Sequence, residues 1–520
     1  MSKGKKIALI ALIVVAVFII AVAVLVPLLF NVDRYRPQVV QRLQEETGKP
    51  VSIGRLTLHI LPRVAIRVEN FSMGNPAGFP QGDVVKARDI SAVVDAGALW
   101  DRRVVIESLT LDDPVLNLLQ TASGKWNFEN PPAPAKPKGD SDGGPSSFTL
   151  GVISKVIISN AQMKAANLLA SGREGPAYFQ GQGVTLELQQ VDLNAFTASA
   201  TLRLPQSQYP GVLARLLFWQ PSVAFAADQR PPAAQGTLKA DSLSFSNLQV
   251  TSVQSKLRLY PRQVFFDDLN FDLYDGHSAG GLDFNFAGRN PRYSTNAKLS
   301  GVNMEKLLNA FPQGRGKMTG TMDGNVKLAG EIAHSDDPLA GMQGVGKVNV
   351  KNGRLPSLNL NKNLMMLAKL SNLGAAQGDP SSFSSMSSDF NIGGGRLTSN
   401  NISIIGNGVD IDAAGALTMA GAGSLDYLGN AKLEAGQSPV SGLLSGLTGA
   451  TMENGKLKLP FGIGGTMDNP RFILKSLGSS GQMNAIQGLM GGQQGAQSGQ
   501  QQPSDLVQGI SGLFKKKKQP

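Results

Sequence analysis

The sequence predicts a mainly β protein whose body follows one N-terminal transmembrane helix. Residues 7–30 form an uninterrupted apolar run. At about 1.5 Å per residue this run spans roughly 36 Å, enough to cross a bilayer. In the rest of the chain, apolar and polar residues alternate in many short segments, which is the period of half-buried strands. Charged residues are 17% of the chain and glycines number 60 in 520, against usual values of about 25% and about 7%. This composition favours many short strands joined by tight turns.

The apolar run predicts a retained membrane anchor. Three lysines precede it within residues 1–6 and three arginines follow it within residues 31–42, so the positive-inside rule gives a modest preference for a cytoplasmic N-terminus. A cleavable signal peptide is the alternative, because Ala21-Val22-Ala23 resembles a cleavage site. Signal peptides, however, have apolar cores of only about 7–15 residues. We therefore expect a single-pass protein with residues 1–6 in the cytoplasm and the body in the bacterial periplasm.

Residues 31–130 are expected to form the first β region, which opens with a short helix. The helix is predicted over Arg36–Thr47, where three apolar residues share one face and a glycine follows the last residue. It is expected to lie near the membrane surface. Alternating residues then predict strands around residues 64–69, at Asp83–Val94 and at residues 104–111.

Residues 131–147 are rich in proline, glycine and serine and lack apolar periodicity. They are expected to form a linker or a long exposed loop. The second β region is expected over residues 148–475. Two short helices are predicted within it, Val302–Phe311, which a proline ends, and the weaker Leu364–Leu370.

Residues 476–503 are expected to be a Gly/Gln/Ser-rich tether, because they hold too few apolar residues to fold. The tail, residues 504–520, is expected to be an amphipathic helix with a basic end. Such a helix suits an anionic membrane surface, although docking on the sheet and a solvated, unfolded tail are alternatives. The candidate membrane-surface residues are Leu506, Val507, Ile510, Leu513, Phe514, Lys515, Lys516, Lys517 and Lys518.

The sequence offers few residues for catalysis or metal binding. It has no cysteine, and its three histidines have no partner at a metal-ligand spacing. Adjacent aspartates such as Asp267 and Asp268 would point to opposite faces of a strand and could not act together. The net charge is +11, but lysines at the two chain ends supply most of it, so the body shows no basic face for nucleic acid. We expect no catalytic residue, no metal, no cofactor and no nucleic-acid partner.

A series of short segments, which follow one another in a characteristic order along the chain, adds a second kind of information. After the anchor these segments are residues 35–37 (YRP), 45–51 (EETGKPV), 61–62 (LP), 68–71 (VENF), 106–114 (IESLTLDDP) and 124–128 (GKWNF), and later 274–277 (YDGH), 320–324 (GTMDG), 406–411 (GNGVDI) and 459–470 (LPFGIGGTMDNP). In content and order they resemble the AsmA family of Gram-negative envelope proteins. The chain departs from the family at residues 124–128, where members often read G-x-x-N-W, and at residues 274–277, where they tend to read Y-G-G.

The resemblance implies an inner-membrane anchor followed by a long, curved antiparallel β-sheet with a few short helices, whose apolar inner face forms a groove. Family members are associated with moving phospholipid toward the outer membrane and with outer-membrane assembly, and the family supplies no catalytic residues. The expected partners are therefore phospholipid, the inner membrane, and the outer membrane or its assembly proteins. The candidate groove residues are Val64, Ile66, Val68, Phe245, Leu257, Leu259, Leu282, Phe284, Phe286, Ile402 and Ile404.

Two alternatives stay open at the level of sequence. The two β regions could be closed sandwiches that cover each other's apolar faces, and the protein could be a periplasmic scaffold or regulator of outer-membrane protein assembly. Length also matters, because the largest family members are several times longer. With strands about 4.8 Å apart, roughly 20–25 strands would give a groove about 100–120 Å long. The chain is therefore expected to be a partial conduit, a partner of a longer conduit, or an assembly factor.

Overall fold

The structure, a computed structural model, describes residues 31–129, 152–195, 231–286, 291–331, 341–356, 381–434 and 451–474, apart from short gaps at residues 62, 101–104, 193–194, 312–313, 407–408 and 420–422. The segments predicted to be cytoplasmic and transmembrane (1–30), the predicted linker (131–147), the helix predicted at Leu364–Leu370, and the predicted tether and tail (476–520) lie outside these ranges. Among the described residues, no helix has the length and apolarity needed to cross a membrane.

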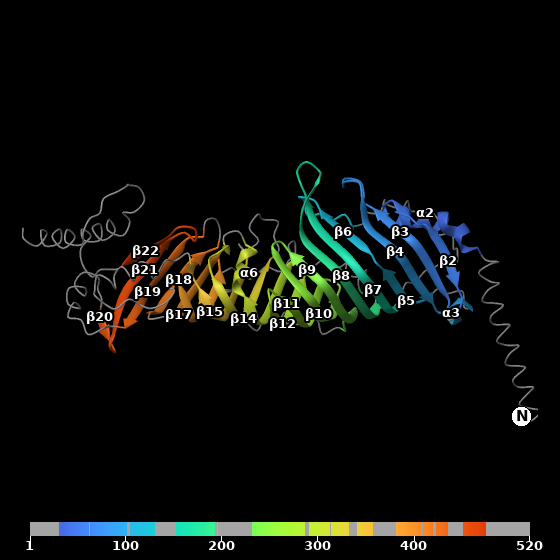
Figure 1. Ribbon diagram of the computed structural model, residues 1–520. Helices are drawn as coiled ribbons and strands as arrows, with labels where there is room; N and C mark the ends of the chain where they lie inside the picture. The colour runs from blue at the N-terminus through green and yellow to red at the C-terminus, as the bar shows by residue number, and fades with distance from the viewer. Residues whose placement is uncertain are drawn as a thin grey trace, which may run out of the picture.

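The described strands form one long sheet of 22 strands, which runs from the N-terminal to the C-terminal end of the elongated body (Figure 1). The first strands are β1 (Val51–Ser52), β2 (Arg55–His59), β3 (Ala65–Gly74), β4 (Asp83–Val94), β5 (Ile106–Asp112), β6 (Val115–Gln120), β7 (Val152–Leu168), β8 (Glu174–Asp192), β9 (Ala234–Phe245), β10 (Leu248–Tyr260) and β11 (Gln263–Leu273). The remaining strands are β12 (Gly276–Asn285), β13 (Arg292–Asn303), β14 (Thr319–Glu331), β15 (Gln343–Arg354), β16 (Ser382–Gly393), β17 (Arg396–Gly406), β18 (Val409–Thr418), β19 (Leu425–Glu434), β20 (Thr451–Glu453), β21 (Lys456–Gly465) and β22 (Pro470–Leu474).

From β7 to β19 each strand pairs with the next one in antiparallel orientation, and β19 then pairs with β21. The expectation of a purely antiparallel sheet is wrong in one place, because β5 and β6 both pair with β7 in parallel. Asp113, which has a φ of 47°, and Pro114 break one strand position into β5 and β6 without reversing its direction. Parallel neighbours require a crossover connection, and residues 121–151 connect β6 to β7. The sheet is therefore mixed.

Helices are few and short among the described residues: η1 (Val32–Tyr35), α2 (Arg36–Thr47), α3 (Ala96–Trp100) and α6 (Met304–Asn309). Helix α2 has the predicted bounds and ends at Gly48, whose left-handed φ of 63° is the conformation that glycine adopts at no steric cost. Its Val40 and Leu43 pack with Leu56 and Val68 at the first strands of the sheet. Helix α6 is shorter than the predicted Val302–Phe311, because residues before Met304 still pair with β14.

Asn127 fastens the loop after β6 to the sheet. Its side chain is fully buried, and its Oδ1 accepts a hydrogen bond from the Leu119 amide at 3.0 Å. Its Nδ2 donates to Asn75 Oδ1 at 2.8 Å and to the Asn117 carbonyl at 2.7 Å. The amide thereby joins the β3–β4 loop, strand β6 and its own loop, which explains why this position of the GKWNF segment takes an asparagine.

We expect Asn127→Ala to lower the free energy of unfolding by about 2–4 kcal/mol, because the change leaves several buried polar groups without a partner. Urea denaturation followed by tryptophan fluorescence measures the loss. The control is Asn270→Ala, which removes a single hydrogen bond to the Asp268 carbonyl and should cost about 1 kcal/mol or less. Equal losses in the two variants would contradict the role given to Asn127.

Candidate functional site

One face of the sheet carries a continuous row of apolar side chains. Side chains that are directly opposite each other on paired strands lie on the same face, so the pairing register can be followed from strand to strand. The row crosses the sheet through Leu58, Ile66, Ala92, Leu109, Val156, Leu188, Gly236, Leu257, Phe266, Leu282, Thr295, Leu328, Gly344, Ile392, Leu397, Leu417 and Leu425. Only two glycines and one threonine interrupt it.

The later strands carry a second row on the same face. In β14, Leu328 belongs to the first row and Met322 to the second, and their even spacing places both side chains on one face. The second row contains Val302, Met322, Val350, Met386, Ile404, Ile411, Ala431 and Leu459, each directly opposite the next. We call the face that holds both rows the apolar face and the opposite one the outer face. The apolar face therefore extends along most of the sheet.

The candidate groove residues all lie on this apolar face. Ile66, Leu257 and Leu282 belong to the first row and Ile404 to the second. Val68, Leu259, Phe284 and Ile402 alternate with them along the strands, and Val64 and Phe286 continue the same spacing one residue outside β3 and β12. Phe245 is directly opposite Leu248 and Phe179. Their exposure differs: Leu257 (4% exposed) and Ile404 (8%) are buried, whereas Ile66 (39%), Phe245 (44%) and Phe286 (50%) are open to solvent.

Aromatic rings gather where β11 and β12 approach residue 286. The rings of Phe266 and Phe284 meet edge to face with centroids 6.1 Å apart, and Phe284 stacks on Phe286 at 6.1 Å. Such pairs add packing specificity beyond the area they bury. These three rings form an aromatic surface on the apolar face, at which Phe286 is half exposed.

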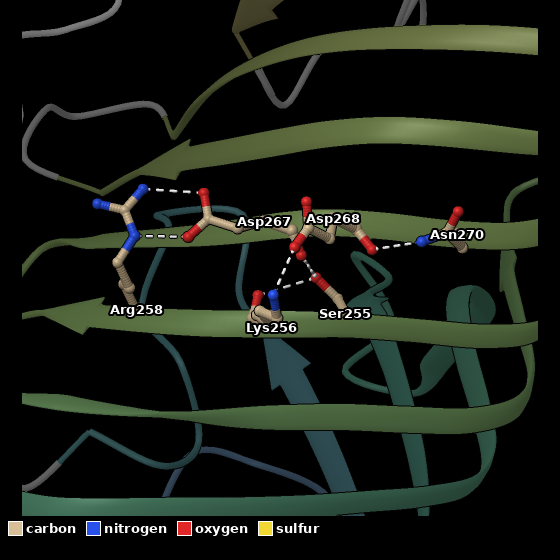
Figure 2. A network of polar contacts seen from close by, with 6 residues as sticks. All are labelled: Ser255, Lys256, Arg258, Asp267, Asp268 and Asn270. Carbon is tan, nitrogen blue, oxygen red and sulfur yellow. Dashed lines mark hydrogen bonds and ion pairs between the residues drawn. The ribbon is translucent and has the colours of Figure 1, made fainter.

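The outer face carries many charged side chains, with scattered apolar ones such as Phe265 and Leu428 among them. Figure 2 shows a section of it, where Arg258 binds Asp267 through two hydrogen bonds and Lys256 Nζ donates to Asp268 at 2.8 Å. The expectation that Asp267 and Asp268 point to opposite faces is wrong, because the positive φ of Asp268, 51°, interrupts the alternation and both carboxylates bind outer-face cations. In the same view Ser255, which belongs to the apolar face, satisfies its hydroxyl by donating to the Asp267 carbonyl at 3.0 Å. Further cross-strand ion pairs on the outer face are Lys155–Glu187, Arg292–Glu331, Lys347–Asp389, Lys432–Asp412 and Lys456–Asp410. Exposed pairs of this kind contribute about 0–1 kcal/mol each, so their main effect is to keep this face in water.

No second layer of described strands covers the apolar face. The described strands contact chiefly their neighbours in the sheet, while α2 packs on β1 and α6 on β13 and β14. The apolar face of a single sheet must be covered by something apolar. Within the described residues, η1 and α2 supply such cover at β1 and β2, and α6 supplies it at β13 and β14.

Electrostatics on the outer face are set by ion pairs, and Asp89 is the most buried carboxylate among them. Arg67 donates to Asp89 from Nε at 3.1 Å and from Nη2 at 2.9 Å, and these hydrogen bonds lower the pKa of Asp89 below its ordinary value. Asp283 behaves in the opposite way, because burial raises its pKa although Gln263 donates to it.

Among the described residues, no group of histidines and carboxylates could hold a metal ion.

The Arg67–Asp89 pair predicts a stability that depends on pH. A carboxylate whose pKa is depressed in the folded state contributes stability above its unfolded pKa, about 3.9, and that contribution is lost as the pH falls through the folded value. We expect Asp89→Asn to lower the free energy of unfolding by about 1 kcal/mol at neutral pH and to have a smaller effect near pH 3. Urea midpoints at the two pH values test this, and an equal loss at both would exclude the ion pair as the cause.

Sequence reasoning missed many residues of the apolar face, including Phe266, Val302, Met322, Val350 and Phe461. Phe266 was obscured because residues of positive φ interrupt the two-residue period beside it. Asp268 in β11, with a φ of 51°, places Phe266 and Leu269 in the same cluster despite their odd spacing. The signal that could have found the others is the strand register, which a single sequence does not display.

Comparison with known proteins identifies the family to which the chain belongs. No curated protein and no solved structure matches the chain. The sequence model of the AsmA family matches residues 1–170 and 217–402, which is more than half of the chain and contains the first apolar row from Leu58 to Leu397 except Leu188. The chain belongs to the AsmA family.

Proposed function

We propose that the protein binds the acyl chains of phospholipids along its apolar face and conducts or holds them between the inner membrane and the outer membrane. The observation that carries the proposal is the row from Leu58 to Leu425, an unbroken sequence of cross-strand neighbours along the sheet. An acyl chain that crosses successive strands would meet an apolar side chain at every step except at two glycines and one threonine. The outer face, with its ion pairs, would remain in water.

The energetics favour an apolar ligand. Covering apolar surface stabilises a complex by roughly 25 cal/mol per Å², and contiguous exposed apolar patches on soluble bodies commonly mark ligand-binding grooves or interaction sites. Phe286, which is 50% exposed and stacks on Phe284, supplies such surface on the apolar face. The role proposed is non-enzymatic, because it requires the protein to shield lipid from water and no bond to be made or broken.

The proposal includes the topology expected from the sequence, with residues 7–30 as an inner-membrane anchor and the sheet in the periplasm. The first strands would then lie nearest the inner membrane. Lipid would enter near β2 and β3 and would then cross successive strands toward β22. Residues 504–520 would adsorb to an anionic membrane surface.

The test is to purify the full chain in mild detergent and to identify copurifying lipid by mass spectrometry. Phospholipid at a molar ratio of one or more per chain is the expected result. Absence of lipid, together with copurified outer-membrane proteins, would overturn the proposal in favour of a scaffold for outer-membrane protein assembly.

A further inference from the structure

Arg262 lies at the edge of the sheet where β10 ends and β11 begins. The amide of Phe286, the residue that follows β12, donates to the Arg262 carbonyl at 2.7 Å. This hydrogen bond continues the register of β11 and β12 by one position, because Gln263 is directly opposite Asn285. Arg262 and Phe286 are therefore directly opposite each other at the end of these strands.

Arg262 has the spacing of the apolar face. Residues directly opposite each other share a face, and Phe286 belongs to the apolar face. Val264, two residues after Arg262, is directly opposite Phe284 on the same face. Arg292, at the same edge, is instead on the outer face, where it pairs with Glu331 at 2.9 Å. Of the described cations at this end of β10–β13, only Arg262 has the spacing of the apolar face.

The surface beside Arg262 is aromatic and partly open to water. Phe286 is 50% exposed, and Arg262 is exposed as well. Phe286 stacks on Phe284, and Phe284 meets Phe266 edge to face. Tyr293 is directly opposite Phe284 and adds a fourth ring to the same face. An exposed cation thus lies next to an aromatic surface at the edge of the sheet.

A phospholipid requires both of these features. Its acyl chains favour apolar surface, whereas its phosphodiester carries a charge that is costly to remove from water. A lipid whose chains lie on the apolar face must therefore place its phosphate at an edge of the sheet. A guanidinium suits that phosphate, because its planar fork donates paired hydrogen bonds to two oxygens. It has five N–H donors, so it can bind a phosphate alongside other contacts.

We propose that Arg262 binds the phosphate of a phospholipid whose acyl chains cover the rings of Phe284 and Phe286. This inference rests on the proposed function and adds a specificity to it. The site favours lipids that carry a phosphate over diacylglycerol, which offers the same acyl chains without the charge. Arg262 is thereby a specificity-determining residue of the apolar face.

A photocrosslinking residue beside Arg262 tests the proposal on the full chain. p-Benzoylphenylalanine replaces Phe284, which keeps an aromatic ring at the site, or Ile66, which lies on the apolar face in β3. The purified protein is mixed with vesicles of phosphatidylethanolamine and phosphatidylglycerol that contain a minor share of diacylglycerol with the same acyl chains. After irradiation, mass spectrometry gives the ratio of phospholipid to diacylglycerol adducts at each position, relative to the composition of the vesicles.

Each probe is combined with unaltered Arg262, with Arg262→Gln and with Arg262→Lys. The matched control is Arg292→Gln, which removes a cation on the outer face of the same edge. At residue 284 we expect phospholipid to be favoured about tenfold, which corresponds to about 1.4 kcal/mol. Arg262→Gln should remove this preference, and Arg262→Lys should keep part of it, because an ammonium keeps the charge and loses the fork. Arg292→Gln should leave the preference unchanged, and the ratio at residue 66 should respond to none of the substitutions.

The outcomes separate this inference from the proposed function. A ratio at residue 284 that does not respond to Arg262→Gln, or that falls equally with Arg292→Gln, would overturn the phosphate site and leave lipid binding in place. An excess of inorganic phosphate at constant ionic strength should not remove the preference, because the acyl chains also hold the lipid. Loss of the preference would assign the site to free phosphate and overturn the lipid site. No adduct at either position in any variant would overturn the proposed function and the phosphate site together.

Discussion

Leu459→Asp is expected to unfold the C-terminal part of the sheet. Leu459 is 1% exposed, lies directly opposite Ala431, and packs in the largest cluster of buried apolar residues. A carboxylate placed there would have no charged or hydrogen-bonding partner, at a cost of about 4 kcal/mol or more. Circular dichroism and urea denaturation should show a lower midpoint and loss of strand signal.

The matched control is Leu428→Asp in the neighbouring strand. Leu428 points to the outer face and is 49% exposed, so the same chemical change should alter the free energy of unfolding by no more than about 0.5 kcal/mol. If Leu459→Asp were as stable as Leu428→Asp, the second row would not be a packed core.

Ile66→Asp is expected to remove bound phospholipid without unfolding the protein. Ile66 lies in the first apolar row and is 39% exposed, so a carboxylate there stays in contact with water in the free protein. Once an acyl chain covers the position, the charge must lose its water, which costs several kcal/mol. Lipid recovered per mole of purified protein should fall at least about tenfold, since 1.4 kcal/mol already corresponds to that factor, while the urea midpoint stays near that of the unaltered chain.

Gln254→Asp controls for the added charge, because Gln254 is exposed on the outer face between Val253 and Ser255. Its bound lipid should match that of the unaltered protein. An Ile66→Asp protein that folds and keeps its lipid would show that the first row does not touch acyl chains.

The sequence predicted correctly the features that depend on a single strand or helix. Strand β4 and helix α2 have the predicted bounds. Closely spaced valines and alanines mark Asp83–Val94 as a strand, and Arg36–Thr47 carries an apolar face and is followed by a glycine. Alternation also placed the candidate groove residues on one face, since period two is a property of the strand itself.

The sequence was not informative where several strands act together. In β10, Ser252 has a φ of 54°, which lets Val250 and Val253 pack in one cluster despite an odd spacing. The parallel pairing of β5 and β6 with β7 depends on the crossover connection. Each of these is a property of the assembled sheet, which local periodicity does not contain.

The most direct test of acyl-chain binding is a photocrosslinking comparison of the two faces of three strands, β3, β10 and β12, in the full chain. p-Benzoylphenylalanine is placed in turn at Ile66, Leu257 and Leu282 on the apolar face, and at their chain neighbours Arg67, Arg258 and Asp283 on the outer face. After irradiation with phospholipid vesicles, lipid adducts are expected at the three apolar-face positions and at none of their neighbours. Adducts of equal yield on both faces, or on the outer face alone, would contradict the assignment of the apolar face as the lipid-binding surface.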